Sequence, residues 1–120
     1  MANAETVRLT IDNQTSQKMA TGTISLDWGN KVNFESIDAY TNNDSALFCQ
    51  GESGTWTGTE GTATWTINGG TLTFSFNDPY SGDPSVSVSG DAVFNDHFTA
   101  TVGSPGTSGD VRVTATVKPK

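Results

Sequence analysis

Hydrophobic and polar residues alternate along most of this chain, with the period of two that is typical of β-strands burying one face. The last such run is the clearest, because Val111, Val113, Ala115 and Val117 are separated by polar or charged residues. No window of about ten residues shows a helical repeat, so we expect no long helix and at most a turn at 35–40. The same alternation occurs at 7–11, 72–76, 86–88 and 98–102.

Clusters of Asn, Asp, Gly and Pro separate these runs at the spacing of an antiparallel sandwich. Asn68-Gly69-Gly70 lies between the runs 63–67 and 71–76, and it predicts a tight hairpin because Asn and Gly accept positive φ values. The sequence therefore predicts an all-β fold, a single-domain antiparallel β-sandwich of about 8–10 strands that covers residues 1–120.

The net charge of the chain excludes some classes of binding partner. The 120 residues include 13 acidic and 6 basic side chains, which gives a net charge of −7. Nucleic acids and anionic lipids would be repelled, so we expect no nucleic-acid partner. The first residues lack the basic and apolar regions of a signal peptide, and no apolar run is long enough to span a membrane. We therefore expect a soluble chain, either cytoplasmic or secreted without a visible signal peptide.

Residues able to carry catalysis are scarce. His97 is the single histidine, and no nucleophile-elbow motif accompanies it. Cys49 is the single cysteine, so it cannot close an internal disulfide or complete a zinc site. We expect a protein that is not an enzyme and that needs no cofactor.

A calcium site is the metal alternative, because carboxylates and amides suit hard cations. The same residues also satisfy turn geometry beside Pro and Gly, and we expect no metal site. The candidates are Asn77, Asp78, Asp83 and Asp91.

Aromatic residues in turn-rich segments are the best candidates for ligand contact. Trp28 precedes Gly29-Asn30, Trp56 lies among glycines, and Tyr80 follows Pro79. Each ring could gain about 1.5–3 kcal/mol when it is buried against a ligand. Trp65, by contrast, lies in the middle of an alternating run and is predicted to be in the core.

Four short motifs follow one another along the chain: Asn13-Gln14-Thr15, Leu26-Asp27-Trp28-Gly29-Asn30, Phe48-Cys49-Gln50-Gly51 and Gly58-Thr59-Glu60-Gly61. In this order they resemble motifs of the aegerolysins. That family has an Asn-rich first strand, then Trp-Gly-Lys, Ser-Cys-Gly-Arg and Gly-Thr-Glu-Gly segments. Pro79-Tyr80 stands where the family has Cys-Pro-Trp, and Asn30 stands where it has Lys.

The resemblance implies a β-sandwich similar to that of actinoporin-like cytolysins, which binds neutral or zwitterionic lipids such as sphingomyelin with sterol. It also implies haemolytic or toxin-like activity together with a larger pore-forming partner. Trp28 and Tyr80 would then be interfacial anchors of a protein that acts at membrane surfaces. Trp56 is expected to be a third anchor because of its Gly-rich setting alone. Asn30, Asn77 and Asp78 would donate or accept hydrogen bonds at a headgroup.

Two other functions fit the same residues. In a lectin, the aromatic rings would stack on sugars beside Asn and Asp side chains. In a structural or interaction module, the three aromatic side chains would be hidden from water.

Overall fold

The computed structural model describes residues 5–51, 58–106 and 109–120. Within these ranges the chain forms nine strands and one short helix, which confirms the predicted all-β sandwich. The elements are β1 (Thr6–Asn13), β2 (Ala20–Trp28), β3 (Asn30–Phe34), β4 (Thr41–Gln50), β5 (Thr59–Ile67), β6 (Gly70–Asp78), β7 (Ser85–Gly90), α1 (Ala92–His97), β8 (Phe98–Val102) and β9 (Asp110–Pro119).

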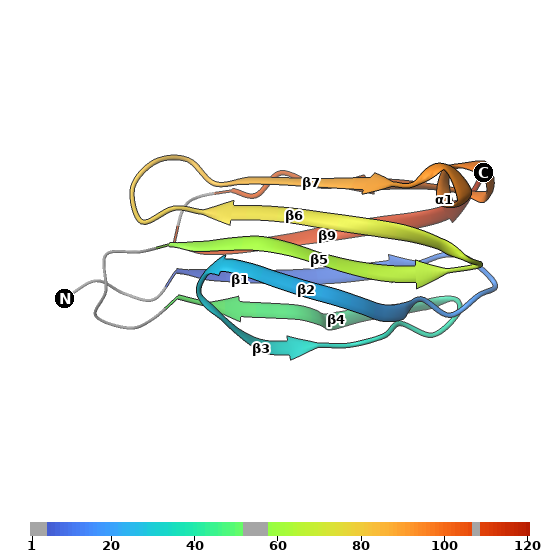
Figure 1. Cartoon of the computed structure of the whole chain (residues 1–120), viewed down its shortest axis with the longest axis horizontal. Coiled ribbons are helices and arrows are strands. Elements are labelled where there is room, and N and C mark those ends of the chain that lie inside the picture. Colours follow the sequence, from blue (N-terminus) through green and yellow to red (C-terminus); the bar gives the residue numbers. More distant parts are fainter. Residues whose placement is uncertain (1–4, 52–57, 107–108) are drawn as a thin grey trace.

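The strands form two sheets that lie one over the other along the long axis of the molecule (Figure 1). One sheet has five strands in the order β3-β4-β1-β9-β8, and the other has four in the order β2-β5-β6-β7. All pairs are antiparallel except β1 and β9, which run parallel over the whole of β1. The sandwich is therefore antiparallel apart from the pair formed by its first and last strands.

The core lies between the two sheets and follows the predicted alternation. In β1 and β9 every second residue is buried, and the same is true of β5 and β6. Trp65 is fully buried, as predicted. Val86, Val88, Ala100 and Val102, on strands at the sheet edges, are only partly buried and pack against the core.

The predicted hairpin joins β5 to β6. Ile67 pairs with Gly70 across a two-residue turn in which Asn68 and Gly69 have φ values of 52° and 77°. Asn followed by Gly adopts two successive positive φ values with little strain, which explains the turn. The hairpin lies at the end of the sandwich where β1 also ends and where α1 lies (Figure 1).

The short helix α1 was not predicted. Asp91 caps its first turn by accepting a hydrogen bond from the Phe94 backbone N–H at 2.9 Å. Phe94 is buried against Gly70 and Gly90, where any Cβ would clash with it. Among the described residues no helix is long and apolar enough to cross a membrane.

Candidate ligand-binding site

Two exposed aromatic side chains border one hollow at the end of the sandwich opposite the β5–β6 turn. Trp28 ends β2 and is 55% exposed, and Tyr80 follows β6 and is 39% exposed. The hollow measures about 440 Å³, within the range of small-ligand sites. We call it the aromatic hollow, and its lining residues are Trp28, Gly58, Glu60, Asn77, Pro79, Tyr80 and Ser81.

A local irregularity in β2 turns Trp28 outward. Strict alternation after the half-buried Leu26 would expose Asp27 and direct Trp28 toward the core. The pairing of β2 with β5 shifts between Leu26 and Trp28, and both Asp27 and Trp28 are exposed. Bulges of this kind re-aim side chains at sheet ends. The indole therefore reaches solvent beside Glu60, its partner in register.

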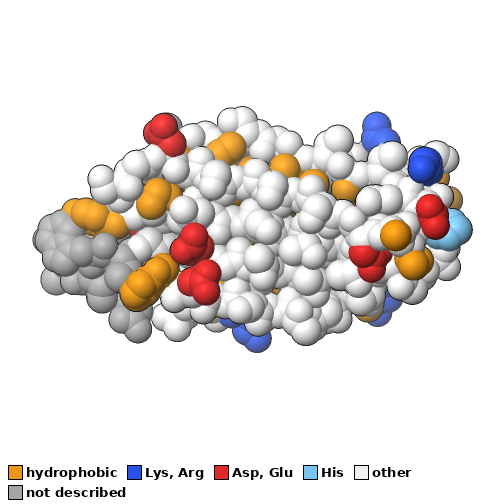
Figure 2. Space-filling model, turned by 45° about the horizontal axis from the view of Figure 1, so that its top comes forward, with side chains coloured by type: hydrophobic (Ala, Val, Ile, Leu, Met, Phe, Trp, Pro, Cys, Tyr) orange, Lys and Arg blue, Asp and Glu red, His pale blue; other side chains and the backbone are white. Residues whose placement is uncertain are grey.

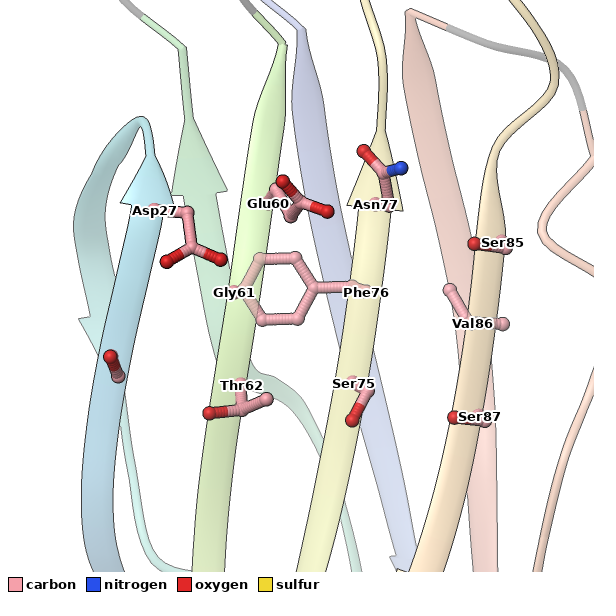
Figure 3. Close-up of a pocket in the computed structure, with 11 residues that line it drawn as sticks. Asp27, Glu60, Gly61, Thr62, Ser75, Phe76, Asn77, Ser85, Val86 and Ser87 are labelled. Carbon is pink, nitrogen blue, oxygen red and sulfur yellow. The ribbon is translucent and has the colours of Figure 1, made fainter.

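A second depression, of about 390 Å³, runs over the outer face of the four-stranded sheet and is shown in Figure 3. Glu60 and Asn77 line both this groove and the aromatic hollow, so the two are adjacent. We call it the hydroxyl groove because Ser and Thr side chains make up much of its lining. It is lined by Ser25, Asp27, Glu60, Gly61, Thr62, Ser75, Phe76, Asn77, Ser85, Val86 and Ser87.

The charge of the combined site is negative. Asp27 and Glu60 supply carboxylates, and none of the described lining residues is Lys or Arg. Figure 2 shows hydrophobic and acidic side chains close together at this end of the face, and several acidic and basic side chains toward the opposite end. The site therefore suits neutral polar groups or cations, and it disfavours an isolated phosphate.

The structure brings together three of the six residues singled out from the sequence. Trp28, Asn77 and Tyr80 all line the aromatic hollow. Asn30 is exposed at the start of β3 but does not line it. Trp56 lies outside the described residues. Because Trp28 and Tyr80 are exposed, two of the anchors that a ligand would need are available, which argues against the structural-module alternative.

The expectation for Asp78 has to be corrected. Its side chain is fully buried and cannot reach a headgroup at the surface. Successive side chains of β6 point to opposite faces of the sheet, so the Asn77 side chain points outward and the Asp78 side chain points into the core. One carboxylate oxygen, Oδ1, accepts a hydrogen bond from the Gly109 backbone N–H at 3.0 Å.

Beneath the aromatic hollow, Asp78 meets a second buried acid, Glu5. Glu5 is 7% exposed, and one oxygen of each carboxyl, Oε2 of Glu5 and Oδ2 of Asp78, has no hydrogen-bond donor. Burial, followed by the charge of Asp78, raises the pKa of Glu5. Burial likewise raises the pKa of Asp78, although the Gly109 N–H opposes that change. Two adjacent buried carboxyls that each have an oxygen without a donor are an unusual arrangement in a protein interior.

Sequence reasoning did not assign a role to Glu60, Asp27 or the hydroxyl groove. The signal that could have found them is the alternation itself, which places every second residue of β2 and β5 on the outer face of the sheet. These residues lie close together because β2, β5, β6 and β7 are neighbours in the sheet. A pattern of residues along a single strand does not predict that order.

The described residues contain no group of three or more His, Cys, Asp or Glu side chains placed to hold a metal ion. Of the four calcium candidates, Asp78 is buried beside Glu5, and Asp91 accepts hydrogen bonds from the N–H groups of Phe94 and Thr71. These bonds lower the pKa of Asp91.

Comparison with known proteins finds the same architecture in several solved structures. RahU protein, crystallised with a Tris molecule, superposes with a TM-score of 0.71 at 18% identity, over 99% of this chain and 96% of RahU. The lipid-binding protein Nakanori superposes with a TM-score of 0.76 at 12% identity, over 95% of this chain and 71% of Nakanori. This chain has the fold of these proteins.

IP-1A from Alcaligenes faecalis shares that fold as well, with a TM-score of 0.71 at 19% identity, over 99% of this chain and 94% of IP-1A. No protein-family model and no curated protein sequence matches the chain. The similarity to known proteins is therefore one of fold.

Proposed function

We propose that this protein is an aegerolysin-type lipid-binding protein, which attaches peripherally to membranes by inserting Trp28 and Tyr80 at headgroup level. The observation that carries the proposal is that both rings are exposed on one hollow at one tip of the molecule. Indole and phenol rings favour the membrane interface because they combine an apolar body with a polar group. The shared fold with a lipid-binding protein and the short sequence motifs support it.

The negative charge of the site favours the ammonium group of a zwitterionic headgroup. Glu60 lies beside Trp28, and aromatic rings with a neighbouring carboxylate attract an ammonium group. Choline or ethanolamine would therefore enter the aromatic hollow, while the phosphate stays at its solvent side. Asn77 would hydrogen-bond the headgroup from β6, and Asn30 and Trp56 are proposed as peripheral contacts. The protein acts by binding and is proposed to have no catalytic activity.

Sedimentation with vesicles of phosphatidylcholine, with and without sphingomyelin and sterol, tests the proposal. We expect Trp28→Ala and Tyr80→Ala each to weaken binding about tenfold or more, which corresponds to about 1.4 kcal/mol of lost ring burial. Tyr40→Ala is the matched control, since Tyr40 is 74% exposed and lies before β4 at the other end of the sandwich. Equal binding by the wild type and both variants would refute the proposal.

The family resemblance extends the proposal to a two-component cytolysin. The protein alone is then expected to bind dye-loaded vesicles without emptying them, and to release dye only with a larger pore-forming partner. Dye release by the isolated protein would contradict this extension while leaving lipid binding intact.

Glycan binding is the second candidate, and the hydroxyl groove favours it. Carboxylate, amide and hydroxyl groups line the groove, and aromatic rings stand at one end, as in many sugar sites. Ser87→Val would obstruct the groove, whereas Ser89→Val places the same change on β7 outside it. A lectin would lose binding only in the first variant and would be inhibited by a free sugar whatever the lipid composition.

A further inference from the structure

We propose that Glu5 and Asp78 share one proton in the folded protein, and that uptake of this proton strengthens ligand binding in the aromatic hollow. The second part rests on the lipid-binding function proposed above. The first part stands on the burial of both carboxyls and on the position of Gly109 against both of them. The Gly109 N–H is 3.0 Å from Asp78 Oδ1, and a Cβ added at Gly109 would lie 3.5 Å from Glu5 Oε2.

The pair has no other means of neutralisation among the residues that the structure describes. The one ion pair there joins Arg112 to Asp110, so neither Glu5 nor Asp78 contacts a cation. The Gly109 N–H satisfies one oxygen of Asp78, and Glu5 Oε2 and Asp78 Oδ2 are left without donors. A single proton satisfies both oxygens at once, because a protonated carboxyl donates to a carboxylate.

The proton belongs on Glu5. The Gly109 N–H donates to Asp78 Oδ1 at 3.0 Å and so favours the charged form of Asp78. Burial raises the pKa of Glu5, and the negative charge of Asp78 raises it further. Glu5 is therefore the group that titrates, and Asp78 is the anion that holds its proton.

Charged groups of both signs lie around the pair. Asp110, at the start of β9, raises the pKa of Asp78 further through its negative charge, and is itself held by Thr6 and Arg112. Glu60 on β5 lies on the outer face and lines the aromatic hollow. Arg8 on β1 lowers the pKa of Asp110. Each additional carboxylate makes a second negative charge in the pair less favourable.

The pair is linked to the aromatic hollow through two short backbone segments. Asn77 and Pro79 line the hollow, and Asp78 lies between them. Gly58 and Glu60 also line it, and between them Thr59 donates its hydroxyl to the Glu5 backbone carbonyl at 2.6 Å. Repulsion between two ionised carboxyls would therefore be transmitted to both walls of the hollow.

The sign of the linkage follows from the raised pKa of Glu5. A carboxyl whose folded pKa lies above its unfolded value binds more protons in the folded state, so it stabilises the fold at acidic pH. That stability is lost as pH rises from the ordinary carboxyl range through the raised pKa. A ligand that needs the intact hollow binds the protonated form more tightly.

The experiment compares wild type with Glu5→Gln, in which an amide donor replaces the shared proton. The melting temperature and the binding to phosphatidylcholine–sphingomyelin vesicles are measured from pH 5 to pH 8. For the wild type we expect the melting temperature to fall by about 5 °C and the affinity for the vesicles to fall about fivefold as pH rises. For Glu5→Gln we expect both quantities to be nearly constant.

Glu35→Gln is the matched control for net charge, since Glu35 is exposed at the far side of the sandwich and should retain the wild-type pH dependence. A carbon-13 NMR titration of the Glu5 carboxyl in the wild type needs no variant. An ordinary glutamate midpoint there would overturn the shared proton even if Glu5→Gln fails to fold.

The outcomes separate the two proposals. A pH-dependent melting temperature that Glu5→Gln abolishes, with no vesicle binding at any pH, would refute the lipid-binding function and leave the shared proton standing. Vesicle binding with the same pH dependence in the wild type and in Glu5→Gln would refute the linkage and leave lipid binding standing.

Discussion

The indole Nε1 of Trp65 donates a hydrogen bond to the backbone carbonyl of Glu35 at 2.9 Å. Trp65 belongs to β5 in the four-stranded sheet, and Glu35 follows β3 in the five-stranded sheet. The bond therefore links the two layers across the core. Phe34 packs edge-on against the same indole, with ring centroids 5.3 Å apart.

Replacing Trp65 with Phe should destabilise the protein by about 1–3 kcal/mol, because the smaller ring fills less of the core and the partly buried carbonyl of Glu35 loses its donor. The same replacement at the exposed Trp28 should change stability by less than about 0.5 kcal/mol. Urea unfolding of both variants measures the difference. An equal loss of unfolding free energy in the two variants would show that the hydrogen bond between Trp65 and Glu35 does not stabilise the protein.

A second prediction concerns Asn13, which is fully buried at the end of β1. Its Nδ2 donates to the carbonyls of Gln17 at 2.8 Å and Asp38 at 3.1 Å. Its Oδ1 accepts from the Thr15 hydroxyl at 2.7 Å. Asn13→Ala should lower the free energy of unfolding by about 2–3 kcal/mol, because several partners lose their bonds together.

The control for Asn13 is Asn42→Ala on the neighbouring strand, where the side chain is exposed. Urea unfolding should show a change of less than about 0.5 kcal/mol there. A loss at Asn13 as small as that at Asn42 would show that water replaces the bonds of Asn13.

Gly69 and Gly103 allow the effect of backbone strain to be measured alone, because a side chain added at either position would meet no other atoms. Gly69 has a φ of 77°, whereas Gly103 lies outside the left-handed region, and nothing stands within 4 Å of an added Cβ at either position. Gly69→Ala should destabilise by about 1–2 kcal/mol because of the left-handed conformation. Gly103→Ala should stabilise by about 0.4–1 kcal/mol by restricting the unfolded chain. Thermal unfolding of both would show shifts of opposite sign, and shifts of the same sign would contradict this reasoning.

The thiol of Cys49 should be inert in the folded protein. The side chain is fully buried, and burial raises its pKa to about 12 despite the nearby charge of Lys31. Because the thiolate is the reactive form, reaction with a disulfide reagent should be negligible at pH 8 and complete after denaturation. Rapid labelling of the native protein would show that β4 opens locally.

The sequence pattern predicted the faces of the strands well, because burial follows a period of two wherever pairing is regular. The strand 111–117 and the Asn68-Gly69 turn are the clearest examples. The helix α1 escaped prediction because its six residues depend on the Asp91 cap and on the space that Gly70 and Gly90 leave for Phe94. The contact between Gly70 and Phe94 joins segments that lie far apart in the sequence, so a local pattern does not reveal it.

The candidate site was only partly predictable for the same reason. The sequence identified Trp28, Asn77 and Tyr80, but it could not show that they border one hollow, since that depends on the order β2-β5-β6. It also placed Asp78 at the surface, because turn-forming residues follow it, whereas the strand continues through this position and directs its carboxyl inward. The burial of Glu5 depends in turn on Asp78 and Gly109, which lie far along the chain.

The strand directions also decide where a reporter group can be attached. Glu5 lies beneath the aromatic hollow, whereas Lys120 hydrogen-bonds to the His97 carbonyl at the opposite tip of a molecule 45 Å long (Figure 1). A dye or surface tether joined at Lys120 would leave the Trp28 tip facing outward, so the protein could be immobilised in one orientation for vesicle capture.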